Sequence, residues 1–170
     1  EHAAIQAGPY RGALPPELRA PELLAKLADM PALLRKAKPL AHGGRNQLAV
    51  AELPLAGGAA QVAIKVFGRQ APPKDWIDFS RGSKACRSWL AAAALHKAGV
   101  GTPAPVGYLD RWQGRRLLES YYLSIFEENL TCFRDELNRL YREDPVCEKI
   151  MGLMQTAAAA IWAMHEAGVV

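Results

Sequence analysis

The sequence predicts an α+β protein with a five-stranded antiparallel sheet, one helix inserted after the third strand, and a hinge and further helices after the sheet. Three observations support this fold class. Short alternating or β-branched segments cluster between residues 39 and 126. A helical pattern from about Asp75 to Ala98 separates the third of these segments from the fourth. Beyond residue 127, apolar residues recur at helical spacing.

Composition excludes several classes of protein. Half of the 170 residues are hydrophobic and 22% are charged, which is typical of a globular protein. The net charge of +4 comes without a dense basic run interleaved with aromatic residues, which argues against a nucleic-acid partner. The three cysteines are an odd number without paired spacing, as in a cytoplasmic protein with reduced thiols. The longest apolar block is too short to span a bilayer.

Residues 1–38 predict an N-terminal helical extension. Leu23, Leu27 and Leu34 belong to a series of apolar residues at helical spacing, and Pro21 and Pro31 interrupt it. We expect one or two short helices that pack outside the rest of the chain. This segment contains no residues that predict chemistry.

Residues 39–126 predict the sheet. We expect a turn at residues 41–46, strands at 47–53, 61–67, 106–112 and 116–126, and a Gly-rich turn at 56–59. Gly99 is placed to end the inserted helix. Residues 127–170 predict one amphipathic helix around Phe133 to Tyr141 and a second that opens at Pro145.

Lys65 stands in the middle of the apolar strand 61–67. A buried ammonium group needs an anionic partner or access to solvent, so Lys65 is either a lysine that reaches water from an edge strand or a ligand of an anion such as a phosphate. Residues 62–65 (Val-Ala-Ile-Lys) match the strand motif that places a lysine on the phosphates of ATP in kinases.

The order of elements around this motif resembles the protein-kinase-like fold. Residues 164–170 (Met-His-Glu-Ala-Gly-Val-Val) are similar to the kinase segment that precedes the catalytic loop. Residues 81–85, 98–105 and 119–123 most resemble bacterial lipopolysaccharide-core kinases, which phosphorylate heptose or Kdo sugars at the cytoplasmic face of the inner membrane. The resemblance covers residues 39 to 170. It implies a kinase-like N-lobe at 39–126, and a hinge with the first C-lobe helices at 127–170.

The resemblance implies an ATP-dependent sugar kinase, of which this chain is the nucleotide-binding part. Lys65 is the catalytic candidate, because it would contact the ATP phosphates. The other cofactor-binding candidates are Gly43, Gly44 and Arg45 in the phosphate loop, Val50 and Ala63 against the base, and Ser124, Ile125, Phe126 and Glu127 in the hinge. The implied partners are ATP, Mg²⁺ and a lipopolysaccharide-core sugar, with peripheral contact to the inner membrane. The metal ligands and the catalytic Asp would follow residue 170, and we expect both ends of the sequence to be cut.

Several alternatives remain open. The turn at 41–46 lacks the full GxGxxG spacing and is equally well an ordinary hairpin loop. The helix position that holds a Glu in kinases is Ser88 here, so Lys65 pairs with Glu119, with Asp78 or with neither. The basic residues Arg81, Lys84 and Arg87 form either a solvated face or a patch for an anionic membrane. The function alternatives are a kinase for another small-molecule or protein hydroxyl, and a non-catalytic kinase-like binding module.

Overall fold

The structure is a computed structural model that describes residues 3–43, 46–68, 78–143 and 147–169. The chain divides into two compact units. The first consists of Glu1–Ala93 and Pro103–Phe126, and the second of Ala94–Thr102 and Glu127–Val170. The first unit carries most of the predicted site residues.

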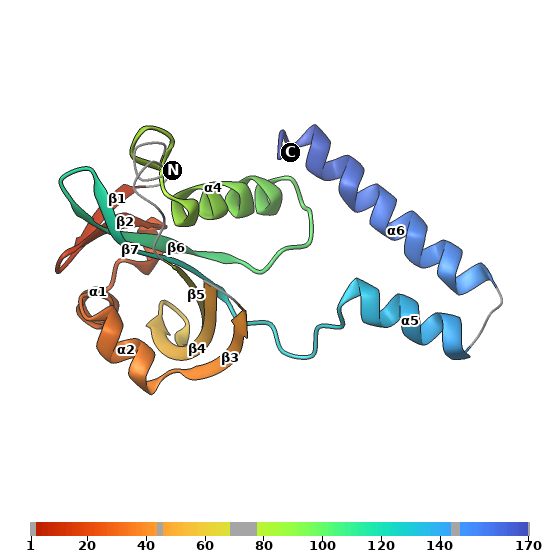
Figure 1. The fold of residues 1–170 in the computed structure, drawn as a ribbon, viewed down its shortest axis with the longest axis horizontal. Helices are drawn as coiled ribbons and strands as arrows, with labels where there is room; N and C mark the ends of the chain where they lie inside the picture. Colours follow the sequence, from red (N-terminus) through yellow and green to blue (C-terminus); the bar gives the residue numbers. More distant parts are fainter. Residues whose placement is uncertain (1–2, 44–45, 69–77, 144–146, 170) are drawn as a thin grey trace. The chain divides into compact units, whose positions relative to one another are not determined.

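The first unit is built on a seven-stranded antiparallel sheet in the order β1-β2-β6-β7-β5-β4-β3 (Figure 1). The strands are β1 (Ala3–Ala7), β2 (Tyr10–Leu14), β3 (Lys38–Gly43), β4 (Asn46–Leu55), β5 (Gly58–Phe67), β6 (Pro105–Gln113) and β7 (Arg116–Ile125). The four strands for which the sequence gave bounds correspond to β4 to β7, whereas β3 includes residues 41–43, where a turn was expected. The expected α+β class is confirmed, but the expected strand count is wrong by the hairpin β1–β2.

The hairpin β1–β2 corrects the expectation of a purely helical N-terminal extension. Its second strand joins the sheet through a short ladder in which residues 11–13 pair with residues 108–110 of β6. The two strands approach closely because glycines stand at the contact. A Cβ atom on Gly12 would lie 1.8 Å from the Tyr108 carbonyl oxygen, and one on Gly107 would lie 2.5 Å from that of Ala13. The alanine-rich segment 3–7 has weak strand propensity, so the sequence pattern gave little sign of β1.

The leucine spacing predicted one or two short helices after this point, and the structure has two α-helices, α1 (Pro21–Leu27) and α2 (Met30–Lys36), preceded by a 3-10 turn, η1 (Pro16–Leu18). Pro21 and Pro31 stand in the first turns of α1 and α2, where a missing N–H group costs nothing. Leu23, Leu27 and Met30 are fully buried, and they pack with Leu53, Ile64, Leu109 and Leu123 of the sheet. These contacts form the main hydrophobic core.

The opposite face of the sheet carries α4 (Lys84–Lys97). Trp89 of α4 packs on Tyr108 of β6 with ring centroids 5.4 Å apart. We expected one continuous helix from about Asp75, but the helical residues 78–81 are separated from α4 by Gly82 and Ser83. Gly82 has a φ of 81°, and the Ser83 hydroxyl accepts a hydrogen bond of 2.9 Å from the Cys86 N–H group. This serine cap starts α4 anew.

The second unit contains α5 (Phe133–Glu143) and α6 (Cys147–Glu166), in agreement with the helical spacing. Pro145, where the second helix was expected to open, lies outside the described residues. Leu140 and Ile150 are buried, whereas Ile161 and Trp162 are 55% and 70% exposed. None of the helices in the described parts of the chain is long and apolar enough to cross a membrane.

Candidate functional site

The strand register places four of the predicted site residues on one face of the sheet. Val50 lies directly opposite Ala63, and Ala63 lies opposite Ser124. Lys65, two residues after Ala63 on β5, therefore projects from this same face. Tyr122 lies opposite both Lys65 and Tyr108, so this is also the face that carries α4. Two small or branched apolar side chains thus adjoin a lysine on a rigid surface.

Lys65 is half-buried, and its amino group lies 5.2 Å from the centroid of the Phe67 ring. It makes no ion pair with any residue that the structure describes. A cation over a ring face is stabilised, but less than a cation beside a carboxylate. The Lys65 amino group therefore keeps its capacity to bind an anion.

Neither carboxylate that we considered as a partner of Lys65 fills that role. Glu119 belongs to the opposite face, where it accepts hydrogen bonds from Tyr10 and Tyr121 and pairs with Arg111. Asp78 pairs with Arg87 at 3.0 Å. Because α4 contains no acidic residue, its Ser88 position offers no substitute. The pairing of a strand lysine with a helix carboxylate, expected for a kinase, is absent from the described residues.

Residues 124–126 were expected to form the start of a hinge whose backbone meets a base. The Ile125 N–H group donates to the Ala104 carbonyl oxygen, and the Phe126 N–H group donates to that of Gln61, each at 2.9 Å. These two donors are therefore already used within the first unit. The Ser124 side chain lies on the face of Val50 and Ala63, whereas Ile125 packs against the core on the other face. Glu127 is exposed and begins the second unit.

The predicted phosphate loop is described only at its borders. Gly43 is the last residue of β3 and pairs with Asn46, the first residue of β4. Gly44 and Arg45 lie outside the described residues. Their role in phosphate binding stays a prediction.

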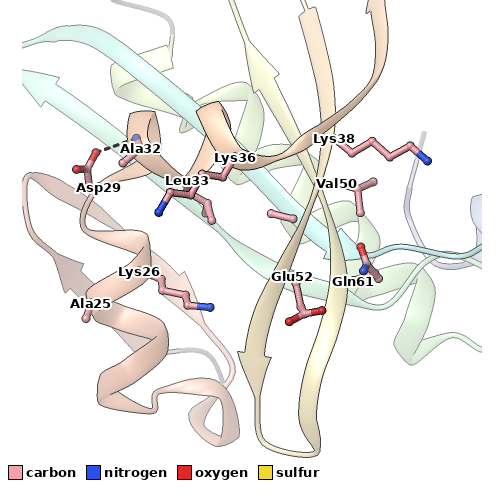
Figure 2. Close-up of a pocket in the computed structure, with 11 residues that line it drawn as sticks. Ala25, Lys26, Asp29, Ala32, Leu33, Lys36, Lys38, Val50, Glu52 and Gln61 are labelled. Atoms are coloured by element: carbon pink, nitrogen blue, oxygen red, sulfur yellow. Dashed lines mark hydrogen bonds between the residues drawn. The ribbon is translucent and has the colours of Figure 1, made fainter.

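A pocket of about 640 Å³ lies where α1 and α2 approach β4 (Figure 2). β3 pairs only with residues 46–50 of β4, so the helices α1 and α2 adjoin the remaining half of that strand. Lys26, Lys36 and Lys38 line the pocket together with Glu52 and Gln61. Among the predicted site residues, Val50 lines this pocket. Of the basic residues, Lys38 lies directly opposite Val50 in the ladder between β3 and β4, at this edge of the sheet.

The structure separates the three residues of the expected basic patch, Arg81, Lys84 and Arg87, into one that is engaged within the protein and two that are not shown to be. Arg87 donates hydrogen bonds to Asp78 and to the Gly82 carbonyl oxygen, which ties the residues before α4 to that helix. Arg81 and Lys84 are exposed. Two of the three cations are thus placed to meet an anionic partner in solution.

Sequence reasoning missed Asp110, a buried carboxylate in β6 on the same face as α4. The available signal was an acidic residue inside the apolar segment 106–112. The signal is weak, because an Asp in a half-buried strand usually projects to solvent. Residues of the unpredicted hairpin line the cavity beside it.

The fold defined by this sheet and its helices is kinase-like. Among solved structures, WaaP in complex with acyl carrier protein is similar to this chain, with a TM-score of 0.55 and 18% sequence identity. The similarity covers 79% of this chain and 48% of the matched chain, so the chain spans about half the length of that neighbour. No protein-family model and no curated protein sequence matches the chain. At this identity the likeness shows the fold alone.

Proposed function

We propose that this chain is the nucleotide-binding part of an ATP-dependent kinase that phosphorylates a heptose or Kdo sugar of the lipopolysaccharide inner core. The observation that carries the proposal is the row of Val50, Ala63 and Lys65 on one sheet face. An apolar surface beside a cation suits a nucleotide, whose base is flat and apolar and whose phosphates are anionic. The structural neighbour WaaP, a lipopolysaccharide-core kinase, supports the choice of reaction class.

Each residue has a defined task in this proposal. Val50 and Ala63 pack against the base, and Lys65 holds a phosphate oxygen, because its amino group is not committed to a described carboxylate. Bound Mg-ATP supplies the transferable phosphoryl group and the metal charge that neutralises it. The backbone of residues 124–126 would meet the base edge through groups other than the Ile125 and Phe126 N–H groups, which are engaged. The enzyme would work at the cytoplasmic face of the inner membrane, where its lipid-linked acceptor lies.

A thermal-shift titration with Mg-ATP tests the nucleotide site. At about 100 times its dissociation constant, a ligand that binds only the folded protein raises stability by roughly 2.7 kcal/mol. We expect this gain in the wild type, a large loss of it in Lys65→Met, and no loss in the control Lys84→Met, whose side chain is exposed at the start of α4. Equal shifts in the wild type and Lys65→Met would refute the assigned role of Lys65.

The acceptor is tested separately in the full-length protein with radiolabelled ATP. We expect label on lipid A-core that carries heptose or Kdo, and none on an aminoglycoside or a protein substrate. Label on another acceptor would support the assignment as a kinase and overturn the assignment of the sugar as its acceptor.

A non-catalytic binding module is the second candidate, because α4 lacks the carboxylate that orients the lysine in kinases. The two candidates differ in one measurement. Mg-ATP that stabilises the full-length protein, without hydrolysis or transfer to any acceptor, would identify the binding module.

A further inference from the structure

A second cavity, of about 680 Å³, lies on the α4 face of the sheet near the hairpin β1–β2. It shares no residue with the row of Val50, Ala63 and Lys65. The hairpin, β6 and the residues at the start of α4 contribute its walls. The lining residues that carry chemistry are Arg11, Asp78, Phe79, Tyr108, Asp110 and Trp112.

Asp110 is a buried carboxylate with an unpaired oxygen atom in the wall of this cavity. The residue is 4% exposed, and its Oδ1 atom has no hydrogen-bond partner among the described residues. Burial raises the pKa of Asp110 to about 6, although the nearby Ser83 and Ser120 hydroxyl groups act to lower it. The group is therefore ionised at pH 7.5. A buried anionic oxygen without a partner is costly, so Oδ1 of Asp110 is a candidate contact for a ligand.

The cations nearest in the fold do not neutralise Asp110. Arg87 is paired with Asp78. Arg11 lies opposite Asp110 in the β2–β6 ladder, but it is exposed and makes no ion pair with a described residue. Tyr108 and Cys86 also face this region, and they interact with each other. No described cation therefore forms an ion pair with Asp110, and the position beside its Oδ1 atom is open to a positive group of a ligand.

Aromatic rings stand beside the unpaired carboxylate. Phe79 and Trp112 meet edge to face with centroids 5.8 Å apart, and Phe79 is 50% exposed. The Arg115 guanidinium carbon lies 5.6 Å from the Phe79 centroid, so this ring already holds a cation. Aromatic faces carry partial negative charge and also bury apolar surface. They favour a ligand that is cationic at one end and apolar at the other.

We propose that this cavity binds a small molecule with a primary ammonium group attached to an apolar or aromatic body. The ammonium group donates to Oδ1 of Asp110, and the body packs on Trp112 and Phe79. The site is separate from the proposed nucleotide surface and does not depend on the kinase assignment.

Calorimetry with three probes of equal size tests the proposal at pH 7.5. The probes are phenethylamine, the neutral 2-phenylethanol and the anionic phenylacetate. We expect saturable one-to-one binding of phenethylamine and at least about tenfold weaker binding of the other two, because the charge-assisted hydrogen bond is lost. Absence of phenethylamine binding, or equal binding of the three probes, would overturn the proposal.

Two variants and one spectroscopic measurement locate the binding. Asp110→Asn should weaken phenethylamine binding at least about tenfold. Arg11→Gln should leave it unchanged, because Arg11 makes no ion pair with Asp110. In the wild type, amide shifts caused by phenethylamine should concentrate at residues 78–83 and 108–112, which makes the test independent of whether Asp110→Asn folds. Shifts elsewhere, or a loss of binding in Arg11→Gln that equals the loss in Asp110→Asn, would refute the assigned contact.

Discussion

Asp110 and Glu119 are carboxylates on adjacent strands whose surroundings shift their pKa values in opposite directions. Burial dominates at Asp110 and raises its pKa to about 6. Burial also acts to raise the pKa of Glu119, but hydrogen bonds from Tyr10 and Tyr121 and the charge of Arg111 outweigh it, so the pKa of Glu119 is lowered. The two groups should therefore give opposite dependences of stability on pH.

For Glu119→Gln we expect a loss of about 1.5 to 3 kcal/mol at pH 7, the usual value of a hydrogen bond to a charged group. A folded-state pKa below the unfolded value adds stability that is present above the unfolded pKa and is lost as pH falls through the folded pKa. The loss caused by the variant should therefore shrink in strong acid. Urea unfolding measures it, with Glu52→Gln, an exposed residue, as control. A cost that is equal at pH 7 and at pH 3 would contradict this assignment.

For Asp110→Asn we expect a gain in stability at neutral pH, where Glu119→Gln causes a loss. The folded-state pKa lies above the ordinary value, so the wild type loses stability as pH rises from about 4 to about 6. The variant has no such charge to bury and should become more stable than the wild type above pH 6, by at most about 3 kcal/mol. Urea unfolding at pH 4.5 and 7.5 measures the difference. A variant less stable than the wild type at pH 7.5 would show that the carboxylate already has a partner such as Arg11.

At the scale of residues, the sequence predicted Lys65 and its apolar neighbours Val50 and Ala63 through one strand motif and the strand before it. Because side chains in a strand alternate between faces, the placement of Ala63 and Lys65 on one face followed from their spacing. Val50 lies on the same face because of the register of β4 against β5, which the sequence does not reveal and the structure shows. Their roles in nucleotide binding stay predictions.

At the scale of elements, Gly12 decides whether the hairpin β1–β2 can join β6. Gly12→Ala would place a Cβ atom 1.8 Å from the Tyr108 carbonyl oxygen, which forces the two strands apart. Overpacking of this kind costs about 1 to 3 kcal/mol, and we expect the upper part of that range because the obstacle is backbone. Thermal unfolding measures the loss.

Gly57→Ala is the matched control. Gly57 lies in the turn between β4 and β5, and an added Cβ atom there meets no atom within 4 Å. The control should leave the midpoint of unfolding nearly unchanged. Equal stability of Gly12→Ala and wild type would mean that β2 does not pair with β6 as described.

The local spacing of apolar residues predicted most helices and strands, and it failed where an element depends on contacts with residues far along the chain. The strands β4 to β7 and the helices α1, α2, α5 and α6 follow the spacing of their apolar residues. The hairpin β1–β2 is held by a partner strand far along the chain, so its own alanine-rich sequence did not reveal it. The break before α4 was readable in principle, since Gly82 followed by Ser83 is a helix-start signal.

At the scale of the whole molecule, the two units differ in buried apolar surface. The first unit has a continuous core between the sheet and the helices α1 and α2. In the second unit, Leu140 and Ile150 are the buried apolar residues among those described. We expect the amides of α5 and α6 to exchange with solvent well before those of β5 and β7 in hydrogen-exchange experiments on this chain. Equal protection in both units would show that they unfold together.

The ladder between residues 11–13 and 108–110 also has a consequence for biosynthesis. During synthesis the hairpin β1–β2 leaves the ribosome before β3, β4, β5 and α4, and its partner β6 follows only after them. Until then, Tyr10 and Leu14, which are buried in the finished core, have no sheet to pack against. The hairpin is thus synthesised well before it can reach its final place, and nascent chains should remain sensitive to proteases at residues 3–14 until β6 has left the exit tunnel.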